Sequence, residues 1–123
     1  MVNTEILKYL QDVLDAINDM QSCFVDFPNR YDLFEKDLMR KCVVERKVEI
    51  MGEAINRIRK VDSTVVIPNA KDVVDTRNRI IHSYDNVTPE FLWGLVVRHI
   101  PELRGCLKRN VKREVVCYLD NFL

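Results

Sequence analysis

The sequence predicts an all-α fold, an antiparallel bundle of four to five helices. Apolar residues recur every three or four positions along most of the chain, which is the spacing of amphipathic helices. The 123 residues include only 3 Gly and 4 Pro, too few turn formers for a many-stranded sandwich or barrel. A hydrophobic fraction of 47% is enough for a core, and the length suits a single domain over residues 1–123.

The first helix is predicted from about Thr4 to Phe24. Asn3 or Thr4 can cap its start, because a short polar side chain accepts a hydrogen bond from a free N–H of the first turn. The stretch Asp26-Phe27-Pro28-Asn29 then interrupts the helical pattern. The apolar positions that define this helix repeat at intervals of three and four: Ile6, Leu7, Leu10, Val13, Leu14, Ile17, Met20 and Phe24.

A long second helix is predicted to begin between Tyr31 and Asp37 and to run to about Lys60. Gly52 lies inside it, where a glycine costs about 1 kcal/mol relative to alanine. A glycine at such a position typically allows another backbone to approach closely. We therefore expect another helix to cross the second helix at Gly52.

The third helix is predicted from about residue 68 to residue 84, with Pro68 as its first residue. The fourth opens with Thr88-Pro89-Glu90, in which a cap, a first-turn proline and a first-turn acid stand in the preferred order. Pro101 is expected to kink or restart this helix, because its ring clashes with the preceding turn. A further helix with a basic face is predicted from residue 102 to about residue 119.

The charges balance overall but are separated along the chain. There are 19 Lys and Arg against 19 Asp and Glu, so the total does not predict strong nonspecific binding to nucleic acid or to an anionic membrane. Residues 1–37 are mainly acidic, whereas residues 98–114 are mainly basic. This separation either steers a polyanion to one face, pairs two chains head to tail, or leaves only a solvated basic helix face.

The four cysteines, Cys23, Cys42, Cys106 and Cys117, form no CxxC pair and stand at no metal-ligand spacing from a histidine. Each lies in an apolar, helix-like context, so we expect buried free thiols in a reducing cytosol. No signal peptide or membrane-spanning run is visible. The sequence thus predicts a soluble, cytoplasmic protein with no membrane partner.

The third helix carries the residues that point to chemistry. On a helical wheel, Arg77 falls in the middle of the apolar stripe, with Asn78 and His82 on its flank and Tyr84 near it. Desolvating a guanidinium is costly unless a partner compensates. The stripe consists of Ala70, Val73, Val74, Ile80 and Ile81, and the opposite, water-facing side carries Asp72, Asp75 and Arg79.

Two interpretations of Arg77 are open. In the first, Arg77 forms a buried ion pair with Glu49 or Glu53, which share one face of the second helix, and His82 caps a helix end. In the second, polar side chains at the C-terminal end of the third helix form a pocket that binds a phosphate. The members of that pocket are Arg77, Asn78, His82 and Tyr84.

The second interpretation provides for RNA cleavage without a metal. Arginine offers a planar fork of donors that matches phosphate oxygens, and histidine titrates near neutrality. A base removes the proton of a ribose 2′-hydroxyl, the oxygen attacks the adjacent phosphorus, and a cation stabilises the charge that builds up. Arg77 and His82 are five residues apart, about 140° around a regular helix, so they do not share a face. Either the helix distorts near His82 or a second subunit of a two-fold dimer completes the site.

The remaining features are weaker. His99 precedes Ile100-Pro101 without an obvious partner, and a surface or bend role is expected. Trp93 and Phe91 are predicted to be core or interface anchors. No Gly-rich phosphate loop, HExxH, GxSxG or CxxC motif is present, which disfavours an ATP-hydrolysing or zinc enzyme. Neither a metal nor a cofactor is therefore expected.

The octad Arg77-Asn78-Arg79-Ile80-Ile81-His82-Ser83-Tyr84 resembles the Arg-x4-His-x-Tyr signature of HEPN-domain proteins, specifically the HepT-like branch. Three other stretches resemble the same family in the right order: Glu45 through Ala54 with its Gly-Glu-Ala, Ile67-Pro68, and Val87 through Leu103. The resemblance covers about residues 4–107, and residues 108–123 form a C-terminal extension expected to be helical. Asn69 departs from it, because many relatives have an aromatic residue after the proline.

The resemblance implies a helical homodimer that acts as a toxin, an endoribonuclease that needs no metal. Its antitoxin is a minimal nucleotidyltransferase, which in this family adds AMP to the motif tyrosine. Carried over to this chain, Arg77 and His82 are catalytic, Asn78 shapes the pocket, and Tyr84 is the modified and RNA-positioning residue. Two alternatives stay open: a catalytically silent subunit that binds a nucleotide or docks a nucleotidyltransferase, and a purely structural bundle.

Overall fold

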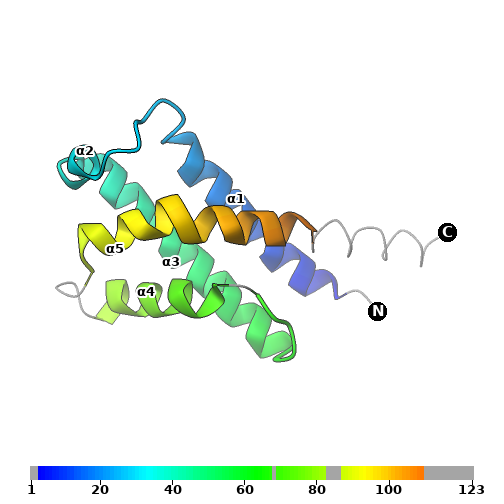
Figure 1. Cartoon of the computed structure of the whole chain (residues 1–123). Coiled ribbons are helices and arrows are strands. Elements are labelled where there is room, and N and C mark those ends of the chain that lie inside the picture. Colours follow the sequence, from blue (N-terminus) through cyan, green and yellow to red (C-terminus); the bar gives the residue numbers. More distant parts are fainter. Residues whose placement is uncertain (1–2, 68, 83–86, 110–123) are drawn as a thin grey trace.

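The computed structural model describes residues 3–67, 69–82 and 87–109 of the chain. Every regular element in these residues is a helix, which confirms the predicted all-α fold (Figure 1). Helical geometry continues beyond the last named element, over residues 100–109. The elements are α1 (Thr4–Ser22), α2 (Tyr31–Glu35), α3 (Leu38–Val61), α4 (Ala70–His82), α5 (Pro89–Gly94) and the π-helical segment η2 (Leu95–His99).

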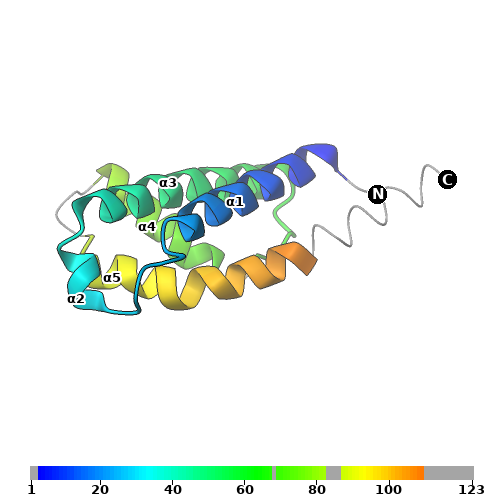
Figure 2. The same ribbon diagram turned by 90° about the horizontal axis from the view of Figure 1, so that it is seen from above.

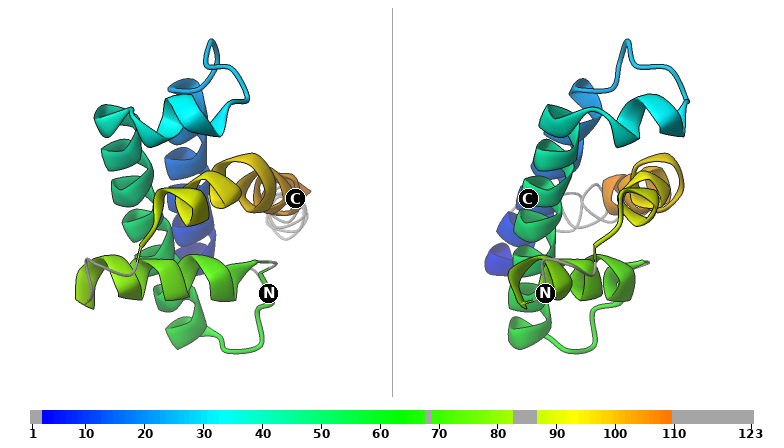
Figure 3. Two further views of the ribbon diagram at one scale, coloured as in Figure 1. Left: turned by 60° about the vertical axis from the view of Figure 1, so that its left-hand side comes forward. Right: turned by 90° about the vertical axis from the view of Figure 1, so that its left-hand side faces the viewer.

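The helices form two antiparallel pairs that cross each other. α1 and α3 run side by side in opposite directions, and α4 runs opposite to the helix that begins with α5 (Figure 1). Viewed from above, α1 and α3 lie on one side of the molecule and the α5 helix on the other (Figure 2). α4 crosses the α1–α3 pair at a steep angle near one end (Figure 3). Because α3 packs against both α1 and α4, it is the central helix of the fold.

The core lies between these two pairs. Its largest fully buried side chains come from every helix except α4, which contributes smaller ones. Each large aliphatic or aromatic side chain buried in this way contributes roughly 1.5–3 kcal/mol to folding. The fully buried set includes Ile17 and Met20 of α1, Phe34 of α2, Met51, Ile55 and Ile58 of α3, Leu92 of α5, Leu95 of η2, and Ile100, Leu103 and Leu107 beyond it.

The helix starts follow the local sequence signals. The Asn3 side chain accepts hydrogen bonds from the backbone N–H groups of Glu5 and Ile6, at 2.9 and 3.3 Å, and so confirms the predicted cap of α1. α3 begins within the predicted window, at Leu38, where the Asp37 carboxylate accepts a bond from the Arg40 N–H. Before that cap the chain forms a separate short helix, α2, which the sequence pattern did not predict.

α4 begins later than the predicted third helix, whose predicted end near residue 84 lies outside the described residues. α4 begins at Ala70 and is described as far as His82, and the residue before it, Asn69, has a φ of 61°, in the left-handed region. The Asn69 side chain donates to the carbonyl oxygen of His99 at 3.4 Å, which ties the start of α4 to η2. The predicted first residue Pro68, the motif residue Tyr84 and the extension 110–123 lie outside the described residues.

The helix that begins with α5 continues through Pro101 instead of restarting there. Thr88 caps it by accepting from the Phe91 N–H at 3.2 Å, and Pro89 is its first residue, as predicted. Just before the proline the backbone widens into the π-helical turn η2, where the Ile100 N–H bonds to the Leu95 carbonyl. A π turn makes room for a proline ring, so the expected kink is replaced by a local widening that contains His99.

An aromatic cluster joins α2 to α5 at one end of the molecule. The rings of Phe34 and Trp93 stack with centroids 5.1 Å apart, and Phe27 meets Trp93 edge-on at 6.1 Å. Trp93 is therefore a core anchor, as predicted, whereas Phe91 is 38% exposed. Arg40 covers this cluster, with its guanidinium 4.5 Å from the Phe27 ring centroid.

Two further predictions can be compared with the described residues. Cys23, Cys42 and Cys106 are free thiols, but the prediction of burial is wrong, since Cys42 is exposed and the other two are only partly covered. Cys42 lies on the solvent side of α3, one turn after the exposed apolar residues Leu38 and Met39. None of the described helices has the length and hydrophobicity needed to span a bilayer.

Candidate functional site

The site is organised by the crossing of α3 and α4 at Gly52, as the sequence predicted. A Cβ atom added to Gly52 would lie 2.5 Å from the Arg77 Cβ and 2.8 Å from its Cγ. Any side chain at residue 52 would therefore push α4 away from α3. The glycine lets the aliphatic stem of Arg77 lie directly on the α3 backbone, which sets where the guanidinium emerges.

The guanidinium of Arg77 is held by two side chains. One terminal nitrogen donates to Glu53 Oε2 at 2.9 Å, and the other donates to Asn78 Oδ1 at 3.0 Å. The third nitrogen, Nε, is buried without a hydrogen-bond partner among the described residues. The ion pair of the first interpretation thus exists, but the Arg77 side chain is 22% exposed and that of Glu53 44%, so it is not a sealed core pair.

The second acidic candidate, Glu49, has a different partner. Its Oε2 accepts from Arg46 at 3.1 Å, one turn earlier on α3. Glu53 also binds a second cation, because its Oε1 accepts from Arg57 Nε at 3.1 Å. This hydrogen bond is the main cause that raises the pKa of the Arg57 guanidinium above its ordinary value. Glu53 therefore stands between two arginines, Arg57 and Arg77.

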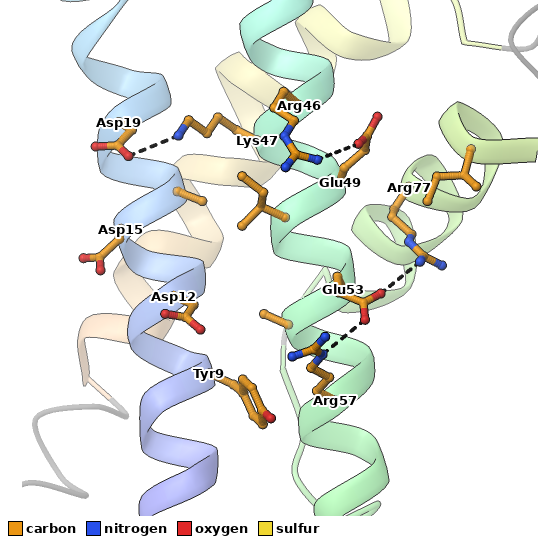
Figure 4. A pocket seen from close by; sticks show the side chains of 14 residues that line it. Tyr9, Asp12, Asp15, Asp19, Arg46, Lys47, Glu49, Glu53, Arg57 and Arg77 are labelled. Carbon is orange, nitrogen blue, oxygen red and sulfur yellow. Dashed lines mark hydrogen bonds and ion pairs between the residues drawn. The ribbon is translucent and has the colours of Figure 1, made fainter.

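These side chains face an open groove between α1 and α3, with a volume of about 500 Å³ (Figure 4). The α1 wall carries three carboxylates, those of Asp12, Asp15 and Asp19. The cations of the groove come from the opposite side, Arg46, Lys47 and Arg57 of α3 and Arg77 of α4. The groove is therefore divided into an acidic wall and a cationic wall, and Lys47 bridges them by donating to Asp19 at 3.2 Å.

His82 does not join this groove. It is the last residue of α4 that the structure describes, it is exposed, and it is not among the residues that line the groove. The helix is regular from Ala70 to His82, so the expected angular separation between Arg77 and His82 holds within one chain. The structure thus brings Arg77, Asn78 and Glu53 together and leaves His82 on a separate surface at the helix end.

One wheel assignment in α4 is wrong. Ile81 was predicted on the buried stripe, but it is 45% exposed and lines the groove beside Arg77. Thr76 is fully buried in its place, with its hydroxyl donating to the Asp72 carbonyl at 2.7 Å. A threonine can be buried in a helix when its hydroxyl bonds to the carbonyl four residues earlier, so hydrophobicity alone misplaced the edge of the stripe.

Sequence reasoning missed Arg57 and Lys47, both of which line the groove. Arg57 had a readable signal, because it follows Glu53 by four residues and such pairs meet on a helix surface. Lys47 had none, since its partner Asp19 lies 28 residues away on another helix.

The comparisons with known proteins agree with one another. A family model described as "Ribonuclease HepT-like" matches residues 6–109. A protein of Thermococcus cleftensis named "Probable ribonuclease HepT" is 32% identical over 104 residues, which cover 79% of this chain and 87% of that protein. A Methanocaldococcus jannaschii protein named "Putative RNase MJ1380" is 30% identical over 106 residues, 85% of this chain and 94% of its own length. No solved structure is significantly similar to the chain.

Proposed function

The chain belongs to the ribonuclease HepT-like family, and from that premise we propose that it is an endoribonuclease that cleaves RNA without a metal. The observation that carries the proposal is the placement of Arg77. Its guanidinium is largely covered yet opens on a groove, and two side chains hold it in place. Covering a guanidinium is costly unless partners compensate, and Nε lacks a partner among the described residues, so a bound phosphate would supply what the protein does not.

In the proposed reaction, Arg77 binds the scissile phosphate and His82 moves protons. Imidazole removes the proton of the ribose 2′-hydroxyl, and the oxygen attacks phosphorus while the P–O5′ bond breaks. The products are a 2′,3′-cyclic phosphate and a 5′-hydroxyl end, which receives a proton from an imidazolium. Arg77 stabilises the charge that builds on the phosphate oxygens, while Glu53 and Asn78 fix its orientation and Glu49 contributes to the charge of the groove.

Because one chain keeps Arg77 and His82 on different faces, we propose that a two-fold dimer completes the site. The exposure of Ile81 supports this, since an isoleucine next to His82 is 45% exposed in the single chain. A second copy that packs on the end of α4 covers this apolar surface and brings the partner's His82 toward Arg77. Analytical ultracentrifugation should therefore give the mass of two chains.

The module to which we assign the protein is a toxin–antitoxin pair in the cytoplasm. A minimal nucleotidyltransferase transfers AMP from ATP to the hydroxyl of Tyr84, two residues after His82, and pyrophosphate leaves. The added phosphate is negative and is attached two residues after His82 in the sequence, so we expect it to repel RNA and to compete for Arg77. Mass spectrometry of the co-expressed complex should find the nucleotide mass on the peptide that contains Tyr84, and the same mass found only on another peptide contradicts this part.

The decisive experiment measures RNA cleavage by the purified protein in excess EDTA. We expect cleavage by the natural protein and its loss in His82→Ala, whose side chain is exposed, so that the fold should tolerate the change. Cleavage by His82→Ala at the rate of the natural protein would contradict the ribonuclease proposal.

A second function is favoured if no cleavage occurs under any condition. In that case the role of the Arg77–Glu53 pair is to join α3 and α4. The protein then acts as a subunit that binds a nucleotide or docks the nucleotidyltransferase. That function predicts a tight complex with the nucleotidyltransferase that survives gel filtration. A purely structural bundle predicts neither, only a loss of stability in Arg77→Ala.

A further inference from the structure

The carboxylate of Glu53 is shared between two guanidinium groups, one oxygen to each. Oε1 accepts from Arg57 Nε at 3.1 Å, and Oε2 accepts from Arg77 at 2.9 Å (Figure 4). Arg57 comes from the same helix as Glu53, one turn later, whereas Arg77 reaches it from α4. The three side chains form a continuous chain of ion pairs along the cationic wall of the groove.

This division leaves Arg77 bound to Glu53 through a single oxygen. Arginine and a carboxylate usually pair through two parallel hydrogen bonds, which use both terminal nitrogens of the guanidinium. Here the second terminal nitrogen of Arg77 donates instead to the Asn78 side chain at 3.0 Å. Each terminal nitrogen carries two N–H groups, so each keeps one that these two contacts do not use. Those groups are the ones a phosphate needs.

We propose that Arg57 is a positioning residue: it holds one oxygen of Glu53 and thereby keeps Arg77 available to an RNA phosphate. The proposal rests on the ribonuclease function above. Without Arg57, Glu53 is free to turn both oxygens toward Arg77 and to occupy the donors that the substrate requires. Arg57 touches neither the RNA nor the reacting atoms and acts only through Glu53.

Replacing Arg57 also changes the charge of the groove, an effect that does not act through Glu53 and that a substitution of Arg46 shares. Arg57, Glu53 and Arg77 together carry one positive charge, and without Arg57 the remaining pair carries none. Five carboxylates and four cations line the groove, so its net charge is −1 with Arg57 and −2 without it. An RNA phosphate approaching Arg77 would then be repelled more strongly, because exposed charges act on each other over about 10 Å in ordinary salt.

Arg57 is itself restrained from the other side. Its guanidinium lies 5.8 Å from the ring centroid of Tyr9, on α1, which holds the arginine across the groove. The Arg57 side chain is 54% exposed, so its ion pair adds little to stability. A substitution of Arg57 should therefore change the site and leave the fold intact.

The test compares Arg57→Gln with Arg46→Gln. Arg46 lines the same groove and pairs with Glu49 at the same distance of 3.1 Å, but that pair does not touch Arg77. We expect kcat/KM for RNA to fall roughly tenfold in Arg57→Gln, less than the hundredfold or more expected for a lost transition-state contact. The melting temperature should not change. An equal fall in Arg46→Gln overturns the proposal, because the charge of the groove alone would then explain the effect.

A double-mutant cycle identifies the route of the effect. In a Glu53→Gln protein, which lacks the carboxylate, replacing Arg57 by glutamine should change kcat/KM by less than twofold, because the two residues act as one unit. Additive effects of the two substitutions overturn the proposal, since Arg57 would then act on RNA directly.

A binding measurement separates this proposal from the ribonuclease function. RNA with 2′-O-methyl groups cannot be cleaved, because the attacking hydroxyl is blocked, so its affinity is measurable whether or not the protein is a nuclease. Weaker binding by Arg57→Gln than by Arg46→Gln supports the role of Arg57 even if no cleavage is found. If the natural protein cleaves RNA and the two variants bind and cleave alike, the role of Arg57 fails and the ribonuclease function stands.

Discussion

Two arginines, Arg40 near the start of α3 and Arg77 of α4, which packs on Gly52 of α3, make different uses of the same kind of side chain. Arg40, at the aromatic end, donates Nε to the Cys23 carbonyl at 2.9 Å and a terminal nitrogen to Asp37 at 2.6 Å, and its plane covers the Phe27 ring. Arg77, at the Gly52 crossing, leaves Nε without a partner among the described residues and shares its carboxylate with Arg57. Arg40 thus contacts a backbone carbonyl, a capping carboxylate and an aromatic ring, whereas Arg77 contacts two polar side chains and faces the groove.

The surroundings differ in the same sense. The Arg40 end is filled by stacked rings from α2 and α5, so that arginine closes a core. Arg77 instead lines an open groove of about 500 Å³ that is rich in charged side chains. An arginine that stabilises the fold contacts fixed acceptors and aromatic rings. An arginine that binds a ligand lines a groove that the ligand can enter.

The largest expected effect comes from replacing each arginine by lysine, which keeps the stem and the charge but removes the planar fork. Arg77→Lys should lower kcat/KM for RNA by about a hundredfold with a nearly unchanged melting temperature, because the lost contact is one to the transition state. Arg40→Lys should cost about 1–3 kcal/mol of stability and leave cleavage intact. Equal losses of stability in both variants would erase the distinction.

A smaller effect is expected at the glycines. Gly52→Ala should destabilise the protein by about 1–3 kcal/mol, because the new Cβ would lie 2.5 Å from the Arg77 Cβ. Gly94→Ala is the matched control, since nothing lies within 4 Å of a Cβ built there. That variant should gain up to about 1 kcal/mol, because alanine favours the helix. Urea unfolding of both variants checks the prediction, and destabilisation of similar size in both contradicts it.

The smallest effect concerns pH. The Asp37 carboxylate accepts hydrogen bonds from the backbone N–H and from the side chain of Arg40, and these bonds lower its pKa. The fold therefore favours the charged carboxylate, and the stability that this carboxylate contributes is lost as the pH falls. Burial, and then the carboxylate of Glu49, raise the pKa of Glu45, so the fold favours its neutral form and loses stability as the pH rises through that pKa.

The two carboxylates therefore predict variants of opposite sign. Glu45→Gln should raise the melting temperature at neutral pH and have no effect in acid, where Glu45 is already protonated. Asp37→Asn should lower the melting temperature at neutral pH and matter less in acid. Melting curves recorded across the acidic range check both, and a gain of stability in Asp37→Asn at neutral pH contradicts the assignment of its partners.

Much of the fold could be predicted because its signals are local. Each of these signals is contained in a short stretch of sequence. They are the helical periodicity, the cap at Asn3, the order Thr88-Pro89-Glu90 and the break before α3. The π turn before Pro101 was not predictable, because the sequence states only that a hydrogen bond is missing there. Whether the helix kinks, restarts or widens depends on what packs around it.

The sequence by itself predicted that the protein is helical, that another helix crosses the long helix at Gly52, and that Arg77 lies on the core-facing side of its own helix. Only the tertiary structure decided that Arg77 pairs with Glu53 and not with Glu49. It also decided that the second oxygen of Glu53 pairs with Arg57. The reason is geometric: periodicity fixes the face on which a residue stands. Choosing between two acids one turn apart depends on how far α4 is shifted along α3, which packing between distant segments sets.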